Sequence, residues 1–598
     1  MTTETRRAEP HDLDEASLRD RAVNAALGNA LFDTLLAAGT IIDMATGELR
    51  TADIGLVGPL IASVHPRGAR SDAETVLDIS GHFLAPGLID THLHIESSMV
   101  TPRRYAETVV PQGTTTICWD PHEVGNVVGL DGVRWAIAAS RDLPLRVLVF
   151  APSCVPSAPG LELAGADFRG AEMAEMLSWP EIAGVAEVMN MRGVIARDPL
   201  MTDIVKAGLD SGKLVSDHAR ELTGANLQAF AAAGIASDHE IVSGEDLLEK
   251  LRAGFTIELR GSHDYVLPGA VAALKSLPQM PQTLTICTDD VFPDDLVAKG
   301  GVLDVLRRLV AYGLPAVDAL RAATLNAAMR IGRRDLGLVA PGRRADLIVL
   351  SDLEQLGVEH VFASGRHAAE AGRLREALRH DQVEGHRTSM KVPSLAPEAF
   401  VPRIAHQRDG FARVRTIVQP RFTRWGEAKV ALRAGEVELP EGTILMAMVH
   451  RHGRRAPVPE LAILEDWGVW RGALATTVSH DSHNLAVFGC DPKDMAAAAN
   501  AVIAAGGGMA VAMGGEILAV LPLPICGLLS DAPTAEVARG FQALKAAADR
   551  IADWKPPFRV FKSVIGASLA CNPGPHLTDL GLTDGSTGEI KPLLIAVP

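Results

Sequence analysis

The sequence has 598 residues and a formal net charge of −16, with 47% hydrophobic and 22% charged residues. These values are typical of an ordinary globular protein of about three to four domains, long enough to bury a sizeable core. The negative charge argues against nucleic acid or an anionic membrane as a partner, because a phosphate-rich surface needs a basic protein face.

The six cysteines lie far apart and form no Cys-x-x-Cys pair, which is typical of reduced thiols rather than of a disulfide framework. Residues 1–19 are rich in Glu, Asp and Arg and carry no apolar core, so we expect no secretory signal there. The longest apolar stretch, near residues 496–515, is interrupted by glycines and favours a buried helix–turn–strand over a membrane span. We therefore expect no membrane partner and a cytoplasmic location.

The chain begins with a polar extension over residues 1–30, in which apolar residues from Ala16 onward recur at helical spacing. Short β-like runs separated by hairpin-sized gaps follow over 31–86, and similar runs return over 336–375. The two flanking pieces predict one sheet domain built from both sides of a long middle region.

The middle region, residues 87–335, alternates short buried strands with amphipathic helices, which is the pattern of a parallel α/β fold. Eight units in about 250 residues match the size of a (β/α)8 TIM-type barrel, with an eight-stranded doubly wound sheet as the alternative. The predicted strands cover residues 87–94, 114–121, 145–151, 182–189, 213–218, 234–239, 255–259 and 284–289. We expect a linker over 376–406 and an additional α/β-type domain over 407–598.

Side chains that bind metal ions recur at the predicted carboxyl ends of these strands, where barrel enzymes place their catalytic groups. His92 and His94, at i and i+2 of an extended strand, project from one face and can chelate one ion. Glu187 lies inside an apolar strand, where an unpaired carboxylate is costly to desolvate. The predicted ligand set comprises four histidines and two carboxylates: His92, His94, Glu187, His218, His239 and Asp289.

A single strand-end histidine is more often a hydrogen-bonding residue than a ligand, but six such side chains together favour a metal centre. Six ligands exceed the number that one catalytic zinc takes, since that ion keeps an open position. The set therefore predicts two divalent ions bridged by Glu187. Manganese and iron are expected first and zinc is possible, because imidazole and carboxylate ligands accept all three.

This arrangement resembles the amidohydrolase superfamily, and more narrowly its bacterial adenine deaminases, from about residue 30 to the end. The matching stretches in the barrel region are Pro86 to Ser98, Asp120-Pro121-His122-Glu123, Ser237-Asp238-His239-Glu240 and Thr288-Asp289-Asp290; those beyond it are His450-Arg451-His452, Ser479 to Leu485 and Leu521 to Gly527. The resemblance implies that the flanking sheet pieces form a composite β-sandwich and that the protein is a homodimer or a larger homo-oligomer. No lysine ends the fourth strand, so hydrolases that bridge their metals with a carboxylated lysine are disfavoured.

The resemblance implies hydrolytic deamination of adenine to hypoxanthine and ammonia by a metal-bound hydroxide, a reaction of purine salvage. Another binuclear amidohydrolase, acting on a different aminated heterocycle or a small amide, is the alternative within enzymes. A metal-free scaffold with the same fold is the alternative outside enzymes. The intact ligand set argues against the scaffold.

Three carboxylates are candidates for proton transfer in that reaction. Asp289 is expected to take a proton from the nucleophilic water and pass it to the leaving amine. Glu123 is expected to protonate the purine ring, with Glu221 as its rival and a solvated loop acid as the alternative for both. Predicted substrate-binding residues are Asp120, His122, Ser482, His483 and Asn484, whereas His450 and His452 are expected to be structural.

Overall fold

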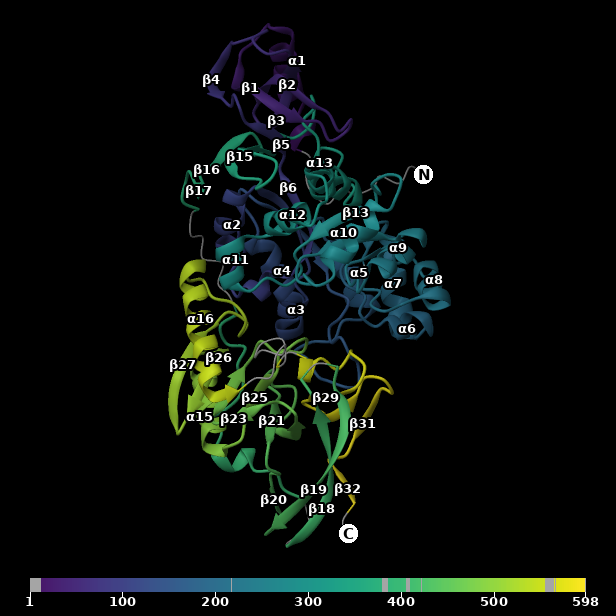
Figure 1. Ribbon diagram of the computed structural model, residues 1–598, viewed down its shortest axis with the longest axis vertical. Helices are drawn as coiled ribbons and strands as arrows, with labels where there is room; N and C mark the ends of the chain where they lie inside the picture. The colour runs from purple at the N-terminus through teal and green to yellow at the C-terminus, as the bar shows by residue number, and fades with distance from the viewer. Residues whose placement is uncertain are drawn as a thin grey trace.

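The computed structural model describes residues 12–216, 218–378, 386–404, 409–420, 422–553, 564 and 566–596. Figure 1 shows three regions along the long axis: a sheet at one end, parallel strands with helices in the middle, and a second large sheet with helices at the other end. None of the described helices combines the length and the apolar character that crossing a membrane requires.

The first region is a nine-stranded sheet that joins two distant parts of the chain. Strand β5 (Phe83–Pro86) pairs antiparallel with β14 (Leu347–Leu350), so that Ala85 lies opposite Ile348. Helix α1 (Ala16–Leu27) packs on the sheet through Leu18, Ala22 and Ala25, the apolar side of its helical repeat. The remaining strands are β1 (Phe32–Ile42), β2 (Leu49–Val57), β3 (Leu60–His65), β4 (Ala73–Asp78), β15 (Val358–Ala363), β16 (Arg366–Glu370) and β17 (Arg373–Leu374).

The middle region contains eight short parallel strands, one for each strand predicted from the sequence. They form a five-stranded sheet, β10-β9-β8-β7-β6, and a three-stranded sheet, β11-β12-β13. A parallel bridge between Leu93 and Asp289 brings the ends of the first and last strands together. The strands are β6 (Leu88–Leu93), β7 (Thr114–Trp119), β8 (Arg146–Ala151), β9 (Ile182–Val185), β10 (Leu214–Val215), β11 (Ser237–Asp238), β12 (Thr256–Arg260) and β13 (Leu284–Cys287).

Helices cover the outside of these strands and bury one apolar face each. In α12 (Val302–Ala311), residues 302, 303, 305, 306 and 309 are buried, which is the spacing of one face of an α-helix. The other main helices of this region are α2 (Pro102–Val109), α3 (His122–Val128), α4 (Leu130–Ala139), α5 (Gly170–Ser178), α6 (Met191–Ile195), α7 (Pro199–Ser211), α8 (Gly224–Ala232), α9 (Gly244–Arg252), α10 (Leu267–Lys275), α11 (Pro293–Lys299) and α13 (Ala316–Arg321).

A buried lysine fixes the end of β11 next to the end of β10. Lys250, on α9, is fully buried, and its Nζ lies 2.7 Å from Asp238 Oδ2 and 3.0 Å from Asp246 Oδ1. The other oxygen of Asp238 accepts hydrogen bonds from the backbone N–H groups of Ala219 and Glu240. One ion pair therefore holds the backbone beside His218 and His239.

Replacing Lys250 with methionine should lower the free energy of unfolding by about 3–5 kcal/mol, because it leaves the buried Asp238 charge without its cation. Urea unfolding followed by tryptophan fluorescence measures this loss. Lys206→Met removes an exposed lysine from its pair with Asp210 and should cost at most about 1 kcal/mol. Equal shifts in the two variants would contradict the assigned role of Lys250.

The third region is a ten-stranded mixed sheet with helices α15 (Pro492–Ala504) and α16 (Thr534–Ile551). Its strands are β18 (Gly410–Val418), β19 (Arg424–Arg433), β20 (Glu436–Glu438), β21 (Thr443–Val449), β22 (Glu460–Glu465), β24 (Ala473–Thr476), β25 (Leu485–Gly489), β26 (Gly508–Met513), β27 (Glu516–Pro522) and β32 (Leu594–Ala596). Smaller sheets pair β23 (Val469–Trp470) with β28 (Ala552–Asp553) and join β29 (Pro575–Thr578), β30 (Gly581–Asp584) and β31 (Glu589–Lys591).

The segment expected to be a linker, 376–406, is only partly one. Val392, Leu395, Phe400 and Ile404 are buried in the core of the third region. Their apolar side chains gain more from this burial than an exposed linker would allow. Residues 379–385 and 405–408 lie outside the described residues.

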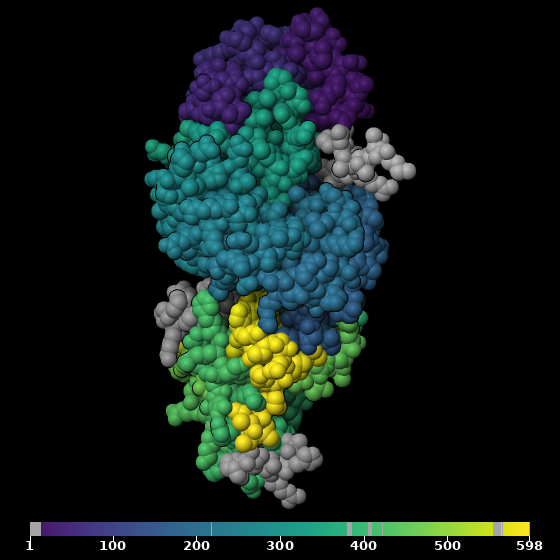
Figure 2. Space-filling view, turned by 90° about the vertical axis from the view of Figure 1, so that its right-hand side faces the viewer, coloured from purple at the N-terminus to yellow at the C-terminus, as the bar shows by residue number. Residues whose placement is uncertain are grey.

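The third region docks onto the middle region through residues 161–163. The backbone N–H of Leu163 donates to Asp579 Oδ1 at 2.9 Å, and its carbonyl accepts from Asn484 Nδ2 at 2.9 Å. The Thr578 hydroxyl donates to the carbonyl of Leu161 at 2.6 Å. In Figure 2 the last part of the chain, drawn in yellow, begins directly below the middle region and runs down over the green part of the third region.

Candidate metal centre and active site

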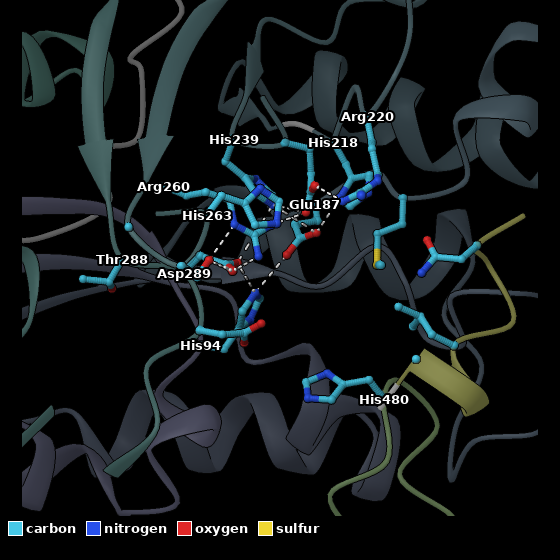
Figure 3. A pocket seen from close by; sticks show the side chains of 18 of the residues that line it. His94, Glu187, His218, Arg220, His239, Arg260, His263, Thr288, Asp289 and His480 are labelled. Atoms are coloured by element: carbon cyan, nitrogen blue, oxygen red, sulfur yellow. Dashed lines mark hydrogen bonds and ion pairs between the residues drawn. The ribbon is translucent and has the colours of Figure 1, made fainter. Parts of the chain in front are cut away.

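The six predicted metal ligands lie together in one buried cluster, although they come from five strand ends along some two hundred residues. The cluster groups His92, His94, Glu187 and Asp289 on one side and Glu187, His218 and His239 on the other. Each of the six residues is at most 8% exposed. Figure 3 shows His94, His218, His239 and Asp289 around Glu187.

The carboxylate of Glu187 lies between the two pairs of histidines. Its Oε1 is 3.1 Å from His92 Nε2 and 2.9 Å from His94 Nε2. Its Oε2 is 3.0 Å from His218 Nδ1 and 3.7 Å from His239 Nε2. Each oxygen therefore faces a different pair, which is the geometry that a bridging carboxylate requires.

The charges of this cluster fit divalent cations. Burial alone would raise the pKa of Glu187, but the four surrounding histidines hold it well below its usual range, so the group is a carboxylate. Burial alone would lower the pKa of His92, yet Asp289 and Glu187 raise it well above its usual value. The buried Nε2 of His92 makes no hydrogen bond. These carboxylates thus demand positive charge, and a metal ion can supply it in place of protons.

Asp289 presents its two oxygens to different partners. Oδ1 lies 3.5 Å from both His92 Nε2 and His94 Nε2, whereas Oδ2 lies 2.5 Å from Arg260 Nη2. The hydroxyl of Ser262 also donates to Oδ2 at 3.1 Å. Burial raises the pKa of Asp289, but Arg260 and the histidines bring it well below the usual range. Asp289 is therefore an oriented carboxylate whose free edge faces the cluster.

The cluster forms the floor of a cavity of about 950 Å³ between the middle and third regions. Its walls include Met189, Arg220, Glu240 and His263 from the middle region. The third region contributes His480, Asp481, Leu569 and residues 571–574. Figure 3 shows His480 facing the cavity from the side opposite Glu187. The cavity therefore needs both regions to be complete.

Of the site residues that were predicted at the end of the second strand, one lies on the cavity wall. His122 lines the cavity, and its ring centre is 4.5 Å from that of His94. Asp120 lies behind it: its Oδ2 pairs with His122 Nδ1 at 3.0 Å, and its backbone carbonyl pairs with His94 Nδ1 at 3.0 Å. Asp120 thus orients two imidazoles and is not on the cavity wall.

Glu123 also lies behind the cavity wall, not on it. Its Oε1 is 3.5 Å from Nδ1 of His480, which does line the cavity. Burial raises the pKa of Glu123. Burial by itself disfavours the His480 imidazolium, but the carboxylates of Glu123 and Asp481 raise its pKa to about 9. A protonated His480 therefore faces the cavity at neutral pH, with Glu123 as its buried partner.

The rival acid, Glu221, lies at the rim, where its side chain is 62% exposed. Glu240 is instead buried in the wall, where it pairs with Arg260 and with Arg220 Nη1 at 2.6 Å. Burial raises the pKa of Glu240, but Arg260 and nearby cations bring it far below its usual range, so this side chain is a carboxylate.

The predicted substrate contacts Ser482, His483 and Asn484 do not reach the cavity wall. Asn484 bonds to the backbone of Leu163 and Arg451, and the Ser482 hydroxyl accepts from Asn484. His483 Nδ1 accepts from the backbone N–H of Ser479. The polar run satisfies buried backbone groups at the junction of the two regions, where each needs a partner. Only its earlier members, His480 and Asp481, line the cavity.

The two remaining histidines of interest have structural contacts, as expected from the sequence. His450 Nδ1 lies 2.9 Å from Asp579 Oδ2, and His452 Nε2 lies 2.8 Å from the carbonyl of Ser482.

Sequence reasoning missed Arg220 and Arg260 as cavity residues, and it chose Ser482, His483 and Asn484 in place of their neighbours His480 and Asp481. Arg260 ends the seventh strand, so the rule used for the other strands would have found it. His480 and Asp481 carried no such signal, because their place depends on how two distant regions dock.

The chain was compared with known proteins. The amidohydrolase family model matches residues 83–368, and the adenine deaminase C-terminal domain model matches residues 420–589. Adenine deaminase 2 of Rhizobium meliloti (strain 1021) is 60% identical over 582 residues, or 97% of this chain and 98% of the relative. Adenine deaminase 2 of Agrobacterium fabrum is 57% identical over 99% of this chain and 98% of the relative, and adenine deaminase of Klebsiella pneumoniae (strain 342) is 57% identical over 97% and 96%.

The parallel strands carry this cluster at their ends, and the amidohydrolase family model matches the same part of the chain. Together these two findings define a hydrolase of the amidohydrolase type, with a TIM-type barrel and extra domains. The nearly full-length relatives narrow that class. The chain belongs to the adenine deaminase family, and the resemblance seen in its motifs is confirmed.

Proposed function

We propose that this protein hydrolyses adenine to hypoxanthine and ammonia at a centre of two divalent ions, with manganese or iron as the preferred metals. The observation that carries the reaction class is the Glu187 carboxylate between two pairs of histidines. The substrate follows from the nearly full-length relatives. We also propose that the middle strands close into a (β/α)8 barrel, which the bridge between Leu93 and Asp289 supports, and that the flanking sheet forms a composite β-sandwich.

The six clustered residues would hold the ions, with Glu187 shared between them. Divalent ions in such a site lower the pKa of water and so supply a nucleophile at neutral pH. Asp289 Oδ1 faces His92 and His94, while Arg260 and Ser262 hold the other oxygen. Asp289 can therefore accept a proton and return it to the departing amine, as general acid–base catalysis requires.

His480 is the group that we assign to the purine ring. It faces the cavity as an imidazolium, and a cationic donor can protonate a ring nitrogen as charge develops on it. Glu123 supports this charge from behind, which revises its role from direct acid to partner of His480. The third region also excludes water from the reacting centre by closing over the strand ends.

The decisive assay measures ammonia released from adenine by the purified protein reconstituted in parallel with manganese, iron and zinc. We expect release with at least one metal, and its loss after chelation and recovery on metal return. Guanine, cytosine, adenosine and hydantoins test the alternative that another heterocycle or a small amide is the substrate. Absence of turnover with every metal would refute the proposal.

His480→Gln should lower kcat/KM for adenine by about 10²-fold, the lower end of general acid–base contributions. In the unaltered protein, activity should fall as pH rises through about 9, because His480 then loses its proton. This alkaline limb should be absent from the pH–rate profile of His480→Gln. His263→Gln is the matched control: burial and Arg260 lower the pKa of His263 to about 3, so the limb should persist. An unchanged limb in His480→Gln would contradict the assignment.

A further inference from the structure

A second group of metal-binding side chains lies in the flanking sheet, outside the active site. His360, His367 and Glu370 each offer one ligand atom, and these atoms lie within 4.8 Å of one another. His360 is on β15, and His367 and Glu370 are on β16, the next strand of the hairpin. Nothing in the proposed deamination reaction uses these residues.

A β-bulge is what brings the three side chains to one face. His360 lies opposite Glu370, and Phe362 lies opposite His367, with the register shift leaving Ala368 without a partner. In a regular strand, residues 367 and 370 would point to opposite faces, because side chains alternate. The extra residue restores His367 to the face of Glu370. Phe362 stacks on the His367 ring at 4.7 Å and fixes its orientation.

The spacing of the donor atoms suits a small divalent ion. His360 Nδ1 and His367 Nε2 are 3.1 Å apart. Two nitrogens bound tetrahedrally at about 2.0–2.1 Å would lie about 3.4 Å apart, so little movement is needed. Glu370 Oε1 lies 3.9 Å from His360 Nδ1, and its half-exposed side chain can close this gap. Water can complete the coordination from the exposed side.

We propose that His360, His367 and Glu370 form a binding site for a borderline transition-metal ion of the zinc, copper or nickel class. Two imidazoles and one carboxylate are the donors that such ions prefer. The site is separate from the active-site cluster and does not depend on the proposed reaction.

Arg375 competes with the metal ion for this site. Its Nη1 contacts His367 Nδ1, and because arginine only donates, the neutral His367 carries its proton on Nε2 and shares it with His360. A metal ion would replace that shared proton and displace the guanidinium. The Arg375 side chain is 50% exposed, so it can move into solvent. Removing Arg375 should therefore tighten metal binding.

The test counts metal in the full-length protein, first loaded with manganese and then equilibrated with zinc and dialysed. The sum of manganese and zinc per chain should be one equivalent lower in the His360→Asn/His367→Asn double variant than in the unaltered protein. Exchange of zinc for manganese in the active site does not change this sum. Glu370→Gln should weaken zinc binding. Glu359→Gln is the matched control: it removes the same charge from the position next to His360 on β15 and should leave zinc binding unchanged. Arg375→Gln should tighten zinc binding about two- to fivefold, the range of an exposed ion pair.

Hydrogen exchange locates the bound ion and guards against loss of folding in the variants. Zinc should slow exchange in residues 358–370 of the manganese-loaded protein and of Arg375→Gln, but not of the double variant. Equal metal totals in the unaltered protein and the double variant would overturn the proposal. So would exchange in this hairpin that does not respond to zinc.

Discussion

Asp289→Asn should lower kcat for ammonia release from adenine by about 10²- to 10⁴-fold, the usual contribution of a positioned acid–base group. The substitution keeps the shape of the side chain and one oxygen, but it removes the ability to take and return a proton. Arg260 and Ser262 can still orient the asparagine oxygen. Bound metal should therefore fall much less than turnover does, and both are measured on the same preparation.

Asp264→Asn is the matched control, because Asp264 is also an aspartate of the cavity wall but pairs with Arg308 at the exposed side. Its activity should stay within a few-fold of the unaltered protein. Retention of more than a tenth of the original kcat by Asp289→Asn would show that another group carries the proton.

Glu187→Gln should remove both metal retention and activity. The amide is neutral and can present only one oxygen to a cation, whereas the carboxylate faces both histidine pairs. Replacing a residue that hydrogen-bonds to a metal ligand costs about 10–100-fold in metal affinity. The loss of Glu187, a ligand shared by both ions, should cost more than that. Metal content after dialysis and kcat with excess manganese measure the two effects separately.

Glu162→Gln offers a close comparison, since Glu162 is equally buried but its carboxylate accepts from the Ser157 hydroxyl and the backbone N–H of Ala158. Burial raises the pKa of Glu162 to about 8, so this group is already largely neutral at pH 7 and the amide should change little. Normal metal content in Glu187→Gln would contradict the bridging role.

The sequence predicted most of what the middle region contributes, because strand ends obey simple rules. Each predicted strand has a counterpart, and the six proposed ligands could be picked from the residues that follow them. The predicted strands were too long at some ends: Glu187 lies two residues beyond β9 (Ile182–Val185). The error did not matter for the ligand set, because strand ends and the loops directly after them face the same cavity.

The contribution of the third region was not predictable in the same way. The polar run 479–484 indicates that its side chains need hydrogen-bonding or charged partners. It does not indicate which groups those partners are. Asn484 finds the backbone of Leu163, while His480 finds Glu123, and only the docked arrangement separates these roles. The exposed Glu221 illustrates the same limit, since its neighbour Arg220 turns inward to Glu240.

The pairing of β5 with β14 has a consequence for biosynthesis. Ala85 leaves the ribosome with its hydrogen-bonding edge exposed, and its partner Ile348 is made roughly 260 residues later. At about 5–20 residues per second, that edge waits about 13–50 s for its neighbour. The intervening parallel strands must therefore assemble while the unpaired edge of β5 remains available to other nascent chains. A holdase chaperone would be of most use during this interval.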